Sequence, residues 1–237
     1  YTMISNQDFY KIKKIAKNST KIILFGDSNQ LKNIKGDEFL ISSKDEFKIN
    51  TLEIIHRQED KKFQKYLDKT CLNGDISYIN QNYNKNDFIN SPELILSSTN
   101  EDIDIINEMG FKNNKNENID GFKKKSPIIF NSEFKDLDIV NNEMGFITDI
   151  KNKILYITME DKREIIIPIE LANKKITINK KIYSSISLAH SITYHKVQGQ
   201  TLNRNIVINT NRLFEKTRML YVAVSRVREL KQLYILD

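Results

Sequence analysis

Apolar and polar residues follow two different patterns along the first hundred positions. Apolar residues at helical spacing predict helices over 7–17 and 59–72. Two short and largely apolar runs, 21–25 and 93–98, are typical of strands buried on both faces of a parallel sheet. Strands that alternate with helices in this way predict an α/β fold around a parallel sheet.

The pattern changes after a polar stretch at 112–125, which we interpret as a loop or linker. Beyond it, the segments 145–150, 153–159 and 163–169 have the length and composition of short strands separated by polar turns. We interpret them as a meander that belongs to a small β-barrel inserted into the α/β fold.

The α/β pattern returns near the end of the chain. A strand is predicted at 206–208, a helix at 215–227 and a last strand at 232–236. Thr99 or Asn100 is expected to cap the helix after the second strand, because both side chains can accept a backbone N–H.

Composition adds a weaker indication. The 237 residues are 39% hydrophobic and 29% charged, with a net charge of +6 and a sequence pI near 9.1. A basic chain suits a polyanionic partner, but a solvated surface rich in lysine and asparagine explains the charge equally well. No apolar run approaches the roughly 18 residues of a membrane span, so no membrane partner is expected. The single cysteine, Cys71, fits an intracellular, reducing compartment.

Four phrases carry the chemistry, and they occur in a fixed order. Residues 25–31 read FGDSNQL, 52–58 read LEIIHRQ, 188–202 read LAHSITYHKVQGQTL and 221–228 read YVAVSRVR. The last two resemble the fifth and sixth motifs of superfamily 1 helicases, and the first two resemble the third and fourth. About ten matching positions fall in the continuous phrase 188–202, so a helix with merely satisfied polar residues is the weaker interpretation.

The resemblance implies an ATP site. Gln30 would sense the terminal phosphate, and Arg57 and Arg226 would act as arginine fingers on the charge that develops there. We interpret Tyr221 as a core position of the sixth motif, His56 as a partner of local backbone, and Arg228 as a surface charge or backbone contact. The predicted catalytic residues are Arg57, Arg226 and Gln30; the predicted ATP-binding residues are Gly26, Asp27, Gln30, Arg57, Gln198, Gly199 and Arg226.

The resemblance also implies contacts with nucleic acid. A short helix after Ala189 would direct Thr193, His195 and Lys196 toward the phosphates of a single strand. Residues 96–100 resemble a Thr-Asn segment of RecD-like helicases, which adds Thr99 and Asn100. The implied partner is single-stranded DNA, tracked from 5′ to 3′ while duplex is unwound; single-stranded RNA stays open.

Residues 141–147 resemble the opening of the SH3-like barrel that RecD/Dda-type helicases carry, with Asn142 where glycine is usual. Asparagine tolerates a positive φ better than most residues. The resemblance implies a P-loop NTPase type of sheet, RecA-like, in which 1–55 is the tail of a first RecA-like domain. Residues 56–127 and 186–237 would form the second such domain, and 128–185 the inserted barrel.

Two expected parts do not occur in the sequence. It contains no Gly-x-x-x-x-Gly-Lys-Ser/Thr loop to cradle phosphates, and no acid pair to hold Mg²⁺. The segment 1–5 resembles the residues that follow that pair, whereas we interpret Asp37-Glu38 and Asp45-Glu46 as surface pairs. ATP and Mg²⁺ are therefore expected cofactors of a full-length enzyme, with no metal site in this chain.

The sequence thus predicts the C-terminal part of an ATP-dependent DNA helicase, with a missing N-terminal RecA-like domain as its partner. Alone it is expected to lack ATPase activity. Two alternatives stay open: a viral-type superfamily 1 RNA helicase, and a non-catalytic nucleic-acid-binding module that kept the fold.

Overall fold

A four-stranded parallel sheet forms the centre of the computed structural model, which describes residues 4–32, 47–79, 83, 93–178 and 181–236. The strand order is β11-β10-β1-β9, and every neighbouring pair is parallel. Its strands are β1 (Leu94–Ser97), β9 (Ser191–Thr193), β10 (Ile206–Asn209) and β11 (Leu233–Leu236). This confirms the predicted α/β fold with a parallel sheet.

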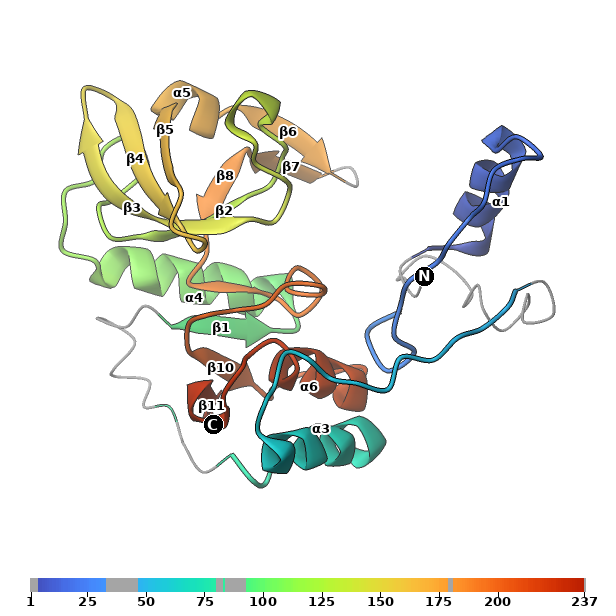
Figure 1. Ribbon diagram of the computed structural model, residues 1–237. Helices are drawn as coiled ribbons and strands as arrows, with labels where there is room; N and C mark the ends of the chain where they lie inside the picture. The colour runs from blue at the N-terminus through green and yellow to red at the C-terminus, as the bar shows by residue number, and fades with distance from the viewer. Residues whose placement is uncertain (1–3, 33–46, 80–82, 84–92, 179–180, 237) are drawn as a thin grey trace.

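Helices cover both faces of this sheet. In Figure 1, α4 (Asn100–Asn113) lies above it, and α6 (Lys216–Val224) and α3 (Lys61–Asn73) lie below. Successive side chains of a strand point to opposite faces, so Leu94 and Leu96 join the core formed with α6 and α3, while Ile95 joins a smaller cluster with Ile106 of α4.

A second sheet is antiparallel and has its own core of buried isoleucine, leucine and phenylalanine side chains. Its order is β5-β4-β3-β2-β8, with α4 between it and the parallel sheet (Figure 1). The strands are β2 (Pro127–Phe130), β3 (Met144–Lys151), β4 (Ile154–Met159), β5 (Glu164–Pro168) and β8 (Ile186–Leu188). The meander is confirmed. The pairings leave β5 and β8 at opposite edges, so barrel closure stays a prediction.

Smaller elements complete the antiparallel part and the end of the chain. The hairpin β6 (Lys175–Ile178) and β7 (Lys181–Ser184) lies beside β8, and the strands of the antiparallel sheet run from 127 to 188. The domain boundaries predicted at 128 and 185 stay a prediction. The remaining short helices are α5 (Ile169–Ala172), η3 (Lys135–Leu137) and η4 (Leu230–Gln232).

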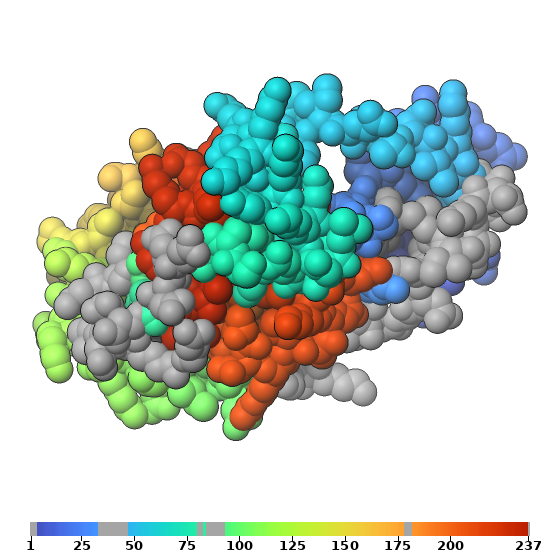
Figure 2. Space-filling view, turned by 90° about the horizontal axis from the view of Figure 1, so that it is seen from below, coloured from blue at the N-terminus to red at the C-terminus, as the bar shows by residue number. Residues whose placement is uncertain are grey.

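In the described part of the N-terminal region, the helix α1 (Asn6–Ile15) is followed by irregular chain over 17–32 and 47–60. Figure 1 draws α1 apart from the two sheets, and Figure 2 shows the segment before α3 leading across to it. The strand predicted at 21–25 is wrong: these residues have no strand structure, and Ile23 and Phe25 are 61% and 77% exposed. A strand needs a neighbouring strand for its backbone hydrogen bonds, and none of the described strands pairs with this run.

Two helix predictions also need correction. The helix expected after Ala189 is instead the strand β9 and a turn over 194–199, because Ser191, Ile192 and Thr193 pair with β1. The helix predicted over 215–227 is shorter, since α6 ends at Val224 and Ser225 caps it. The acidic pairs Asp37-Glu38 and Asp45-Glu46 lie outside the described residues, as does most of the segment 1–5.

Candidate functional site

A cavity of about 460 Å³ brings together residues from four of the sequence phrases. It lies where the turn at 27–30, the segment 55–58, Thr201 and the end of α6 meet. The residues that line it are Asp27, Gln30, Ile55, His56, Arg57, Gln58, Leu67, Thr201, Tyr221, Ser225, Arg226 and Arg228. The three predicted catalytic residues therefore share one cavity, although 196 positions separate Gln30 from Arg226 in the numbering.

Arg57 is held on the wall of this cavity by two contacts with distant parts of the chain. Its Nε donates to Oγ1 of Thr201 at 2.9 Å, and its Nη1 donates to the carbonyl of Ser225 at the end of α6. Burial lowers the pKa of Arg57, and the positive charge of Arg228 adds to that effect. The side chain stays charged, because an arginine cation does not lose its proton in proteins.

Arg226 is 1% exposed and is folded against the last turn of α6. Its Nε donates to the carbonyl of Val222 at 3.0 Å, its Nη2 to Oγ of Ser225 at 2.6 Å and its Nη1 to the carbonyl of Gln200 at 3.2 Å. The C-terminal end of a helix carries partial negative charge, which favours a cation there. Burial and the neighbouring Arg57 lower the pKa of Arg226 to about 10.

The two arginines give the cavity a clear electrostatic preference. Burial disfavours the charged form of each guanidinium, and the two positive charges repel one another. A bound anion with several oxygens would relieve this repulsion and accept hydrogen bonds from both guanidinium groups. The arrangement therefore favours a phosphate-rich ligand.

The turn predicted as the third motif docks against α6. The hydroxyl of Tyr221 donates to the Asp27 carboxylate at 3.0 Å, and Nε2 of Gln30 donates to the same carboxylate at 3.2 Å. Arg218 Nη1 donates to the carbonyl of Gln30 at 2.9 Å. Burial, together with the Asp27 carboxylate, raises the pKa of Tyr221 and keeps it a donor. Asp27 and Gln30 thus contact α6, the helix that is followed by Arg226.

Three predicted ATP-binding residues lie beside the cavity and do not line it. Gly26 is exposed and precedes the docked turn. Nε2 of Gln198 donates to the carbonyl of Leu31 at 3.3 Å, which ties the fifth motif to the third. Gly199 is exposed and has φ +85, a conformation that favours glycine. Their role at the nucleotide stays a prediction.

Besides His56 and Arg228, which were interpreted as a backbone partner and as a surface charge or backbone contact but line the cavity, sequence reasoning missed four polar residues of its wall: Gln58, Thr201, Tyr221 and Ser225. Gln58 is buried, and its Nε2 donates to the carbonyls of Val227 at 2.6 Å and Ser225 at 3.3 Å. The interpretation of Tyr221 as an apolar core position is wrong, because its hydroxyl meets Asp27 across the cavity. Position inside the motif phrases was the available signal for all four.

The predicted nucleic-acid residues of the fifth motif occupy the carboxyl end of β9 and the turn after it. Oγ1 of Thr193 accepts the backbone N–H of Lys196 at 3.3 Å. The ring of His195 stacks on the exposed Phe214, with centroids 6.2 Å apart, and burial lowers its pKa. Lys196 Nζ donates to Oδ1 of Asn131 in the antiparallel part at 2.9 Å, and burial lowers the pKa of this lysine. The ammonium of Lys196 is therefore hydrogen-bonded to another part of the protein.

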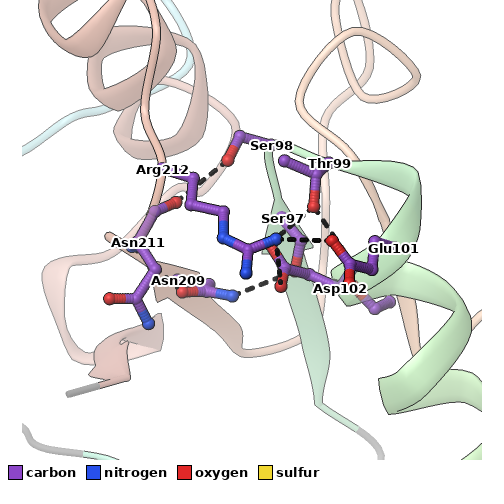
Figure 3. Close-up of polar contacts among 9 residues, drawn as sticks. Ser97, Ser98, Thr99, Glu101, Asp102, Asn209, Asn211 and Arg212 are labelled. Carbon is purple, nitrogen blue, oxygen red and sulfur yellow. Dashed lines mark hydrogen bonds and ion pairs between the residues drawn. The ribbon is translucent and has the colours of Figure 1, made fainter.

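Thr99 lies at the neighbouring strand end, after β1 (Figure 3), and Asn100 follows it as the first residue of α4. Thr99 caps α4: its Oγ1 accepts the N–H of Asp102 at 3.2 Å and donates to the Asp102 carboxylate at 2.7 Å. Arg212 Nη1 pairs with Glu101 at 2.7 Å in the same cluster. Asn100 is the exposed first residue of the helix. Two acidic residues in that first turn already complement the helix dipole, which makes this end a less favourable place for phosphate.

Over the described ranges, no group of three or more His, Cys, Asp or Glu side chains is suited to hold a metal ion. Within the same ranges, we find no helix with the length and apolar character needed to cross a membrane.

Comparisons with known proteins show likenesses in sequence and in fold. A family model described as "AAA domain" matches residues 1–93. The ATP-dependent DNA helicase PIF3 of Trypanosoma brucei brucei (strain 927/4 GUTat10.1) is 42% identical over 50 residues. That stretch is 21% of this chain and only 6% of the trypanosomal protein.

Two solved structures share the fold over nearly the whole chain. Pif1 helicase from Candida albicans aligns with a TM-score of 0.73 and 20% identity, covering 100% of this chain and 70% of that one. Bacteroides Pif1 bound to ssDNA aligns with a TM-score of 0.70 and 17% identity, covering 99% and 68%. The likeness to these solved structures is therefore one of fold over nearly the whole chain, and the AAA domain model covers its first 93 residues.

Proposed function

We propose that these residues serve an ATP-dependent DNA helicase, in which they supply the arginine side of the ATP site and a grip on single-stranded DNA. The observation that carries the proposal is the meeting of Arg57 and Arg226 in one cavity with Gln30. A module that only bound nucleic acid would have no use for two mutually repelling arginines, of which Arg226 is buried and Arg57 half-buried.

The chemistry of the arginines fits phosphoryl transfer. ATP with Mg²⁺ would supply the phosphoryl group and neutralise part of its charge. Arg57 and Arg226 would stabilise the negative charge that grows on the phosphate oxygens, an effect worth about 10³ to 10⁵ in rate for such fingers. Gln30, which shares the Asp27 carboxylate with Tyr221, is positioned to change partners when the terminal phosphate leaves.

The grip on DNA would come from the carboxyl ends of β1 and β9. Ligands of α/β sheets bind in the crevice outside such strand ends. Thr193 and His195 offer a hydroxyl and an imidazole there, whereas the acidic first turn of α4 makes Thr99 and Asn100, at the next strand end, the weaker part of this grip. Contacts of this kind hold phosphates without reading sequence, as translocation requires. We propose 5′ to 3′ movement with them, following the RecD/Dda-like resemblance.

The test measures ATP hydrolysis by the full-length protein with and without single-stranded DNA, and separation of duplexes that carry a 5′ or a 3′ tail. We expect DNA to stimulate hydrolysis and 5′-tailed duplexes to be opened. The 237 residues alone should not hydrolyse ATP, because they contain no phosphate loop.

Three outcomes separate the alternatives. Stronger stimulation by single-stranded RNA than by DNA would favour an RNA helicase. Binding of single strands with no hydrolysis by the full-length protein would favour a non-catalytic module. Robust DNA-stimulated hydrolysis by the 237 residues alone would contradict the assignment of the phosphate loop to another part of the enzyme.

A further inference from the structure

The segment 200–202 runs along both arginines of the cavity. The carbonyl of Gln200 accepts from Nη1 of Arg226 at 3.2 Å, and the N–H of Leu202 donates to the carbonyl of Arg226 at 2.9 Å. Between them, Oγ1 of Thr201 accepts from Nε of Arg57 at 2.9 Å. Gln200 and Thr201 therefore each contact one of the two guanidinium groups, and Leu202 contacts the backbone of Arg226.

The side chain of Gln200 holds this segment in place. Its Nε2 donates at 3.0 Å to the carbonyl of Asn142 and at 3.0 Å to the carbonyl of Lys196. Asn142 belongs to the antiparallel part, just before β3, and has φ +72. Its backbone amide in turn donates to the carbonyl of Phe130 in β2 at 2.8 Å. One amide group thus links the arginine cavity to the antiparallel sheet.

A second contact supports the same turn from the same side. Lys196 Nζ donates to Oδ1 of Asn131 at 2.9 Å, and Nδ2 of Asn131 donates to the carbonyl of Ser184 at 3.0 Å and to Oγ of Ser187 at 2.7 Å. Asn131 is 4% exposed, so its position is fixed by its surroundings. The turn is therefore braced against the antiparallel sheet at two points.

We propose that Gln200 is a positioning residue for Arg226. The antiparallel sheet holds Gln200 through the carbonyl of Asn142, and Gln200 in turn holds the guanidinium of Arg226 on the wall of the cavity. Gln200 touches no predicted ligand. Its amide fixes the 200–202 segment, whose backbone orients the guanidinium. The kinetic part of the proposal rests on the proposed function; the placement of Arg226 does not.

The first test is independent of ATP hydrolysis. Phenylglyoxal reacts with exposed guanidinium groups, and peptide mass spectrometry of the full-length protein gives a modification rate for each arginine. Gln200→Met keeps the side-chain length and removes both donated hydrogen bonds. We expect the rate at Arg226 to rise about fivefold or more, as a group that opens locally gains access to reagent.

Two other arginines serve as internal references. Arg228 is exposed and should react equally fast in both proteins. Arg204, two residues beyond the segment, has a side chain only 10% exposed and is paired with Glu160 at 2.9 Å, so it should stay protected. Equal protection of Arg226 in parent and variant would overturn the proposal. Loss of protection at Arg204 as well would overturn it too, since the effect would then be general loosening.

The second test is a double-mutant cycle on DNA-stimulated ATP hydrolysis by the full-length protein. We expect Gln200→Met to lower kcat about 10- to 100-fold with little change in KM, because a misplaced group costs that much in rate. Gln200→Glu should lose more, since its carboxylate would face two carbonyls. In an Arg226→Ala background, Gln200→Met should cost almost nothing further, because residues that act as a unit are not additive.

Gln7→Met provides the matched control, a glutamine exposed on α1. It should leave both the modification rates and kcat unchanged. Full additivity of the Gln200 and Arg226 substitutions would overturn the proposal. An inactive parent protein would contradict the proposed function instead, while the phenylglyoxal result would still decide the placement of Arg226.

Discussion

At the scale of single residues, burial gives Arg226 its importance. A guanidinium that is 1% exposed has lost nearly all its hydration, and neutral carbonyl and hydroxyl oxygens recover only part of that cost. The nearby positive charge of Arg57 makes the burial of the Arg226 cation less favourable still. An anion that entered would therefore bind to groups already oriented and already poorly solvated, which is the condition under which electrostatic stabilisation is largest.

Arg226→Ala in the full-length protein should lower DNA-stimulated kcat about 1000-fold or more, because the charge on the reacting phosphate would lose one finger. Binding of single-stranded DNA should change by less than about threefold, since the side chain lies away from the carboxyl ends of β1 and β9. Arg226→Lys should not restore the rate, because an ammonium lacks the planar fork. Steady-state kinetics and DNA titration check this, and near-normal turnover would remove the finger assignment.

His190 is a second buried ionisable residue, and it gives the fold a pH dependence. Burial, with the nearby Arg204 charge, lowers its pKa from 6.5 to about 4. A folded pKa below the unfolded value means that the stability is fully present above about pH 6.5 and is lost as the pH falls toward 4. A shift of this size corresponds to roughly 3 kcal/mol in the free energy of unfolding.

Denaturant titrations at pH 7 and pH 4 should show this loss in the parent and a clearly smaller loss in His190→Gln. His56→Gln is the matched control, since His56 is exposed and its replacement should leave the pH dependence unchanged. Equal pH dependence of the parent and His190→Gln would show that another group governs acid sensitivity.

At the scale of elements, local signals were predictable and contacts between distant segments were not. The end of α3 at Gly74, with φ +72, and the cap at Thr99 follow from the residues themselves. The strand β9 was mistaken for a helix because its pairing with β1 is set by residues nearly a hundred positions away. For the same reason, Arg57 and Arg226 were found through their motifs, while the contact of Thr201 with Arg57 and those of Gln58 with the carbonyls of Ser225 and Val227 could not be read from spacing.

At Gly110, α4 packs against His190, just before β9, with no room for a side chain. A Cβ at this position would lie 2.5 Å from the imidazole ring of His190, which is nearer than side chains approach one another. Alanine would favour the helix by about 1 kcal/mol, but overpacking a filled site costs about 1 to 3 kcal/mol. We expect Gly110→Ala to be destabilising overall, as measured by denaturant unfolding. Glu108→Ala, at an exposed position of the same helix, is the control, and a more stable Gly110→Ala would refute the tight contact.

At the scale of the whole molecule, one buried ion pair joins the two sheets. Arg204 lies just before β10, and its Nε is 2.9 Å from Oε1 of Glu160 in the turn between β4 and β5. Its Nη2 contacts Sδ of Met144 at 3.2 Å, and its guanidinium lies 5.3 Å from the ring centroid of Phe146, both in β3. Burial raises the pKa of Glu160 and lowers that of Arg204, so each charge depends on the other.

Removing one partner should therefore be worse than removing both. Arg204→Met or Glu160→Gln alone leaves a buried charge without its counter-ion, and each should cost about 3 to 5 kcal/mol in the free energy of unfolding. The double variant Glu160→Gln/Arg204→Met leaves no buried charge, so its cost should fall well below the sum of the two. Denaturant unfolding of the four proteins measures this coupling. Lys231→Met, which removes an exposed partner of Glu229, should change stability by less than about 0.5 kcal/mol. Additive losses would mean that the two sheets are held together by their other contacts and not by this pair.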